Sequence, residues 1–221
     1  MKKVQQSGFT LVEIAIVLVI IGLLLGGVLK GQELINSAKV RSLNDKFSGV
    51  TAAWYAFQDR YRAVPGDYNQ ATVNIDSGLT NGQGDGLVNT NAERGQIWAH
   101  LAGAGMISGQ YSGAALGDQN YACPLTICPG NGFGRGMSIT YANEGGNVGN
   151  SNELISGSAI PVAILAELDR KSDDGLATSG NMRLGNGGGG WVGAAATACV
   201  NGTNYNLKWP SDDCAVVLRN F

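Results

Sequence analysis

Hydrophobic and polar residues divide the first 63 residues into three segments of different pattern. A short basic segment, 1–8, is followed by an apolar run over 9–29 whose single charge is Glu13. As a helix, this run of 21 residues would be roughly 31 Å long, which is the thickness of a bilayer core. The lysines of segment 1–8 favour the cytoplasmic side. The pattern therefore predicts a single-pass membrane segment with the remainder of the chain outside.

The third segment, 30–63, is amphipathic. Its apolar side chains recur every four or three residues, at Leu43, Phe47, Val50, Trp54, Phe57 and Tyr61. This spacing places them on one face of a helix, and the first proline is Pro65. We therefore expect one long helix over 9–62, apolar on all sides in its first half and packed on a globular head in its second.

Residues 64–221 are expected to form that head. The local signals predict a helix over 92–101, capped by Thr90 or Asn91, and another over 161–171 with Ser158 as its cap. Strands are predicted over 137–142, 191–200, 205–209 and 215–219, the last three as an antiparallel meander. The fold class is therefore α+β: a long N-terminal helix packed on an antiparallel sheet with loops and short helices.

Composition limits the classes of function. The formal net charge is −2 and only 14% of residues are charged, so there is no basic face for direct nucleic-acid binding. No triad, paired carboxylates or phosphate loop is present, and the single histidine, His100, is expected to be a surface or core residue. We expect a structural protein rather than an enzyme.

Four cysteines form an even set in a chain whose head lies outside the cell. Two disulfides are the default in an oxidising compartment, and three pairings exist. We favour Cys123–Cys128 and Cys199–Cys214, because each closes a local loop. A zinc site is the alternative, although the second pair lacks the close spacing of a zinc knuckle.

Calcium is the only cofactor for which the sequence offers candidates. The segment 81–87 places oxygen donors at alternate positions, which nominates Asp85 and Glu93, but an EF-hand would need its bidentate acid at Ala92. A second group is Asp169, Asp173 and Asp174. Asx turns and helix caps explain both groups without an ion, and otherwise no cofactor is expected.

The junction Gly8-Phe9-Thr10-Leu11-Val12-Glu13, with its basic leader 1–8 and the apolar run 9–29, resembles the class III signal of type IV pilins and pseudopilins. The resemblance implies that a prepilin peptidase cuts between Gly8 and Phe9 and methylates the new amine of Phe9. It also implies a pilin-like fold, in which 9–29 is the polymerisation helix, 30–63 its continuation and 64–221 the head. Many members carry a proline where this chain has Lys30, and nearby glycines could weaken the helix instead.

Glu13 has a physical role in this interpretation. A carboxylate in hydrocarbon costs about 2.5 kcal/mol or more, and pairing with the cleaved amine of Phe9 would lower that cost. The amine of the same chain is about one helical turn away. The pilin resemblance instead implies the Phe9 amine of a neighbouring subunit, and the sequence leaves both pairings open.

Three functions remain. The first is a type IV pilus subunit: an inner-membrane precursor that joins an extracellular homopolymer through the pilus assembly machinery. The second is a pseudopilin of a periplasmic secretion pseudopilus, or a minor pilin. The third, of another class, is a monomeric membrane-anchored binding protein. A head of roughly 160 residues favours the first.

Overall fold

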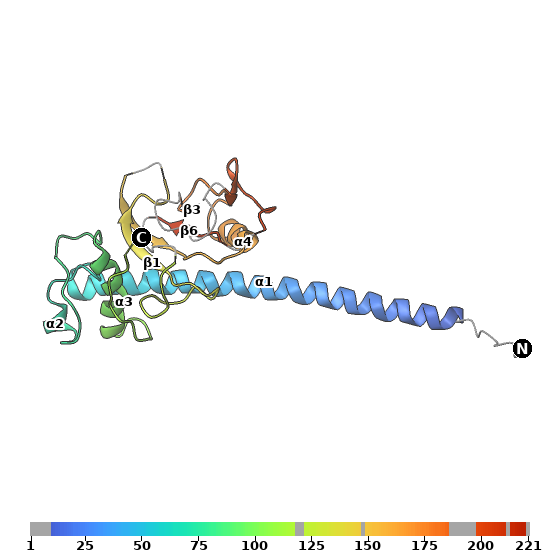
Figure 1. Ribbon diagram of the computed structural model, residues 1–221, viewed down its shortest axis with the longest axis horizontal. Coiled ribbons are helices and arrows are strands. Elements are labelled where there is room, and N and C mark those ends of the chain that lie inside the picture. Colours follow the sequence, from blue (N-terminus) through green and yellow to red (C-terminus); the bar gives the residue numbers. More distant parts are fainter. Residues whose placement is uncertain (1–9, 118–121, 147–148, 186–197, 211–212, 220–221) are drawn as a thin grey trace, which may run out of the picture. The chain divides into compact units, whose positions relative to one another are not determined.

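A computed structural model describes residues 10–117, 122–146, 149–185, 198–210 and 213–219 (Figure 1). The chain divides into two compact units, Met1–Lys39 and Val40–Phe221. A single helix, α1 (Leu11–Tyr61), begins in the first unit and ends in the second. The long helix predicted from the sequence is therefore confirmed, and it runs through Lys30 and the glycines around it without interruption.

Within the second unit, α1 supplies one wall of the hydrophobic core. Its buried side chains are Val40, Leu43, Phe47, Val50, Ala53, Trp54 and Phe57. Trp54 and Phe57 are fully buried, and Phe57 packs against Tyr61 with ring centroids 4.6 Å apart. The apolar stripe read from the sequence is the face that this core covers. Burial of each large side chain contributes about 1.5–3 kcal/mol.

Two short helices follow α1 along the chain, α2 (Ala71–Asn74) and α3 (Asn91–Gly103). α3 begins with a capping box: Thr90 accepts the backbone N–H of Glu93, and Glu93 accepts that of Thr90. Ile97, Trp98 and Leu101 of α3 are fully buried. The sequence predicts α3 and its cap, but it does not predict α2.

The helix predicted over 161–171 is α4 (Val162–Ser172), and its expected cap is wrong. Pro161 is the N-cap residue, and no side chain caps the helix. Ser158 lies too far upstream; its carbonyl instead accepts the amide of Asn131. The fixed extended backbone of Pro161 (φ −56°, ψ 132°) sets the start of the helix without a side-chain acceptor.

The main sheet has four antiparallel strands in the order β1-β2-β6-β3. They are β1 (Ser138–Ala142), β2 (Ser151–Ile155), β3 (Met182–Leu184) and β6 (Val216–Leu218). β1 and β2 pair from Ser138 opposite Ile155 to Ala142 opposite Ser151. β6 lies between β2 and β3, so the end of the chain occupies the interior of the sheet.

The predicted C-terminal meander is wrong in its last strand, whereas its first two strands pair where they are described. β4 (Val200–Asn201) and β5 (Asn204–Tyr205) form a separate two-stranded sheet, whereas β6 pairs with β2 and β3. The strand expected over 205–209 ends at Tyr205, because the N–H groups of Leu207 and Trp209 bond to nearby carbonyls in turns. Of the strand expected over 191–200, residues 191–197 lie outside the described residues.

Candidate assembly site at the N-terminal helix

The first part of α1 exposes large apolar side chains all around the helix. Between Leu11 and Leu29 these side chains are 45–90% exposed. Among the described residues, α1 is the one helix long and apolar enough to cross a membrane, with a mean hydropathy of 2.8 in its most apolar window. A surface of this kind is not stable in water, so lipid or other apolar helices must cover it.

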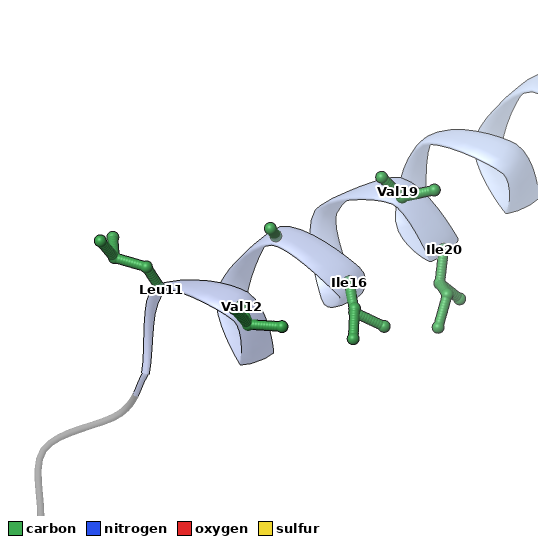
Figure 2. A pocket seen from close by; sticks show the side chains of 6 residues that line it. Leu11, Val12, Ile16, Val19 and Ile20 are labelled. Atoms are coloured by element: carbon green, nitrogen blue, oxygen red, sulfur yellow. The ribbon is translucent and has the colours of Figure 1, made fainter.

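The N-terminal end of this surface is shown in Figure 2. Val12, Ile16 and Ile20 follow one another along one side of α1, and Leu11 and Val19 project in other directions. The spacing of four residues brings successive side chains onto one helix face. The shallow apolar groove that they line is formed by neighbouring side chains of a single helix.

Glu13 lies in the first turn of α1, where it bonds to Thr10. Its Oε2 accepts the backbone N–H of Thr10 at 2.7 Å and the Thr10 hydroxyl at 2.8 Å. The Thr10 Oγ1 in turn faces the backbone N–H of Glu13 at 3.3 Å. This reciprocal arrangement caps the helix, and a carboxylate there is favoured by the helix dipole. The only charge in an apolar surface is thus held at its N-terminal end.

A comparison with protein-family models identifies this region. Residues 3–29 match the model described as the prokaryotic N-terminal methylation motif. The chain carries the class III signal of type IV pilins and pseudopilins. Searches of curated proteins and of solved structures found no match.

The methylation motif and the α+β layout together support a type IV pilin-like or pseudopilin protein. The motif implies processing by a prepilin peptidase and assembly into pilus or secretion machinery. It points to a structural protein, made as a membrane-anchored precursor. The cleavage residues Gly8 and Phe9 lie outside the described residues, so their positions relative to Glu13 stay a prediction.

In the head, the structure pairs the four cysteines locally. Cys123 is bonded to Cys128, and Cys199 to Cys214. The second disulfide joins the β4–β5 hairpin to the segment that enters β6. With both bonds formed there is no free cysteine, and a zinc site would have no thiolate.

The first calcium candidate turns out to be a pair of carboxylates that bind backbone N–H groups. The carboxylates of Asp67, Asp85 and Glu93 lie within 4.8 Å of one another. Asp67 accepts the N–H groups of residues 84, 85 and 86. Glu93 accepts those of residues 83, 89 and 90. These six N–H groups stabilise the two carboxylates without an ion, and calcium binding by Asp85 and Glu93 stays a prediction.

Asp67 was not among the site residues predicted from the sequence, although it is central to this arrangement. Asp67 is only 2% exposed and holds the glycine-rich loop 82–86 against the turn that follows α1. The turn Val64-Pro65-Gly66-Asp67 was visible in the sequence. Nothing in the local pattern showed that its acid would reach a loop 17 residues further along the chain.

The second calcium candidate lies at the end of α4. Asp169, Asp173 and Asp174 also bring carboxylate oxygens within 4.8 Å of one another. Asp169 is fully buried and accepts the hydroxyl of Tyr205 at 2.7 Å. Burial raises the pKa of Asp169, and the nearby charges of Asp173 and Asp174 raise that pKa further. Each carboxylate also accepts one backbone N–H group, from residues 175, 176 and 182. The hydroxyl groups of Tyr205 and Ser179 donate to this cluster, and a hydroxyl oxygen can also face a cation.

His100 is a buried structural residue that joins two loops. Its Nδ1 accepts the backbone N–H of Gly66 at 3.0 Å, and its Nε2 donates to the carbonyl of Thr80 at 2.8 Å. Burial lowers the pKa of His100, although the Thr80 carbonyl and the charge of Asp67 act in the opposite direction. The neutral imidazole therefore matches this site.

Proposed function

We propose that this protein is a structural subunit of an extracellular type IV pilus, cleaved between Gly8 and Phe9 and polymerised through its N-terminal helix. The observation that carries the proposal is the position of Glu13. This carboxylate sits in the first turn of an exposed apolar helix, and Thr10 is its only hydrogen-bond partner there among the described residues. A charge held in such a surface needs a partner of opposite sign once lipid or protein covers it.

Cleavage would supply that partner. Removal of the leader leaves a cationic amine on Phe9, and methylation of that amine preserves its charge. If the amine of each incoming subunit pairs with Glu13 of a neighbour, only one axial stagger leaves no charge unpaired in the apolar core. Glu13 would then select the register of the filament, while the surrounding apolar side chains supply most of the association energy.

The head favours a pilus over a pseudopilus. The compact unit Val40–Phe221 has its own hydrophobic core and two disulfides. Disulfides form in the periplasm as well as outside the cell, so the preference for a pilus rests on the size of the head. A pseudopilin or minor pilin is the nearest alternative, since it would share the same helix. A monomeric membrane-anchored binding protein is the alternative of another class.

Filament assembly by a charge-neutral variant tests the proposal. Glu13→Gln keeps the length of the side chain and an oxygen for Thr10 but removes the charge. We expect this variant to be inserted and cleaved normally, with a tenfold or greater loss of filaments in the fraction sheared from cells. Glu33→Gln is the matched control: Glu33 is an exposed residue of the same helix, paired with Lys30, and its loss should leave filament yield unchanged.

Each alternative has its own outcome. Normal filament yield from Glu13→Gln would overturn the charge-pairing role. Parent protein that assembles but stays in the membrane fraction would indicate a pseudopilus. Parent protein that is never found in an assembly would indicate a monomeric anchored protein.

We also propose Asp169, Asp173 and Asp174 as a candidate calcium site, on the basis of their converging carboxylates. Calcium should then raise the unfolding temperature of the full chain in detergent, magnesium should do so less, and Asp173→Asn should remove the difference. An unfolding temperature that does not respond to calcium would exclude the site.

A further inference from the structure

A polar pocket of about 340 Å³ lies on the head. Its lining includes Arg183 and Arg219, the amide residues Asn150 and Asn181, and Ser151 with two glycines. Arg183 belongs to β3 and Arg219 directly follows β6, its neighbour in the sheet. Ser151 begins β2. The ends of three strands thus bring two guanidinium groups to one cavity.

The two arginines converge on one carbonyl. Nη1 of Arg183 donates to the oxygen of Gly146 at 3.3 Å, and Nη1 of Arg219 donates to the same oxygen at 3.1 Å. Arg183 also donates its Nε–H to Gly180, and Arg219 donates from Nη2 to Gly149. These bonds fix both side chains in place, so the two positive charges are held close together before any ligand binds.

The positive charges of the two arginines differ in how far nearby acidic residues balance them. Arg219 forms an ion pair with the fully buried Glu153, from Nε to Oε1 at 3.0 Å. Arg183 forms no ion pair within the described part of the chain, and its charge helps to lower the pKa of the exposed Asp174. None of the described residues that line the pocket is acidic.

Arg183 also retains hydrogen-bond donors. A guanidinium has five N–H groups, and the bonds to Gly180 and Gly146 use two of them. A carboxylate matches the planar fork of the remaining donors. Asn150 and Asn181 offer amide donors and acceptors of the kind that bind hydroxyl groups. The volume is at the small end of the range for ligand pockets, which suits one sugar ring.

We propose that this arginine pocket binds the carboxylate of an acidic sugar, with Arg183 as the main contact. The inference goes beyond the proposed role in a pilus, because it assigns a ligand to the head rather than a role to the assembly helix. In a surface fibre, such a site would let each subunit hold one uronic acid unit of an anionic polysaccharide.

Calorimetric titration of the full chain in detergent micelles tests the proposal. The probes are sodium glucuronate, glucose as its neutral counterpart, and inorganic phosphate, all at physiological ionic strength. We expect saturable binding of glucuronate, at least tenfold tighter than glucose and tighter than phosphate. Arg183→Gln should weaken glucuronate binding at least tenfold, since it removes a charged hydrogen-bond pair.

Two further variants keep the result interpretable. Arg170→Gln makes the same change of charge at an exposed residue of α4, outside the pocket, and should leave binding within about twofold. Arg183→Lys keeps the charge but loses the planar fork of donors, so it should bind glucuronate more weakly than the parent. This variant provides the test if Arg183→Gln fails to fold. Arg219 is not a suitable target, because its loss would leave Glu153 buried and unpaired.

Several outcomes would overturn the proposal. They are the absence of saturable glucuronate binding, equal binding of glucose, phosphate binding that exceeds glucuronate binding, and parent-like affinity in folded Arg183→Gln or Arg183→Lys. None of these depends on filament formation, so the pocket can fail while the pilus assignment holds, and the reverse.

Discussion

Replacing Asp67 by asparagine should destabilise the head far more than the same change at the neighbouring Asp85. The Asp67 carboxylate is buried; Oδ1 accepts the N–H groups of Gly84 at 2.6 Å and Asp85 at 3.2 Å, and Oδ2 accepts that of Gly86 at 2.7 Å. In Asp67→Asn an NH₂ group replaces one of these oxygens, so at least one loop N–H group faces another donor.

The magnitude follows from these contacts. A buried N–H left without an acceptor costs about 1–3 kcal/mol, and each surviving bond loses about 1 kcal/mol when its acceptor becomes neutral. Relief of repulsion from Glu93 and Asp85 offsets part of this, which leaves about 2 kcal/mol. For a unit of this size, that corresponds to an unfolding temperature lower by about 4–8 °C.

The assay is thermal unfolding of the full chain in detergent, monitored by tryptophan fluorescence. All four tryptophans lie in the unit Val40–Phe221, so the signal reports on the head. Asp85→Asn is the matched control: Asp85 is exposed and, among the described residues, its side chain accepts only the N–H of Leu87, so the change should cost less than about 0.5 kcal/mol. Equal losses in the two variants would refute this reasoning and would indicate that both acids act together, as ligands of one cation would.

Three further predictions concern the head. The double variant Cys199→Ala/Cys214→Ala should lose about 3 kcal/mol of unfolding free energy in denaturant titrations, because the disulfide no longer restricts the unfolded chain by closing the loop between these residues. An unchanged midpoint of the titration would contradict this. His100→Gln should reduce the loss of stability between about pH 7 and pH 5. The lowered pKa of His100 means that the folded state resists protonation, so stability falls as the pH drops below about 6.5. Gly95→Ala should destabilise the head strongly, because a Cβ there would collide with the backbone oxygen of Ala114. At Gly49 a Cβ would meet nothing within 4 Å, so Gly49→Ala should stabilise α1 by up to about 1 kcal/mol. Thermal melts of the two glycine variants that shift in the same direction would contradict this difference.

The sequence was most informative where the pattern is local. The stripe from Leu43 to Tyr61 predicts α1 because the helical repeat alone decides which side chains share a face. Thr90 and Glu93 predict the start of α3 because a capping box lies within four residues. In both cases, interactions inside one element set its position.

Long-range pairing could not be predicted in the same way. β2 and β3 lack a strong alternating pattern, and β3 is only three residues long. Their partner β6 comes from the end of the chain, so strand order depends on contacts that no local signal encodes. The last strand of the predicted meander was misplaced for this reason: β6 pairs with β2 and β3 and not with β5, its neighbour in sequence.

The candidate sites show the same difference between local patterns and long-range contacts. Glu13 was identified from its own context, as a charge in an apolar run. The roles of Asp67 and Arg183 depend on contacts with distant loops, so only the structure showed the six N–H donors around Asp67 and Glu93 and the arginine pocket.

The central claim is best tested by the intact mass of this protein in filaments sheared from the surface of producing cells. We predict a mass equal to residues 9–221 plus CH₂ and less four hydrogens, which corresponds to cleavage before Phe9, methylation of its amine and two disulfides. A chain that still begins at Met1, in cells with an active prepilin peptidase, would contradict it.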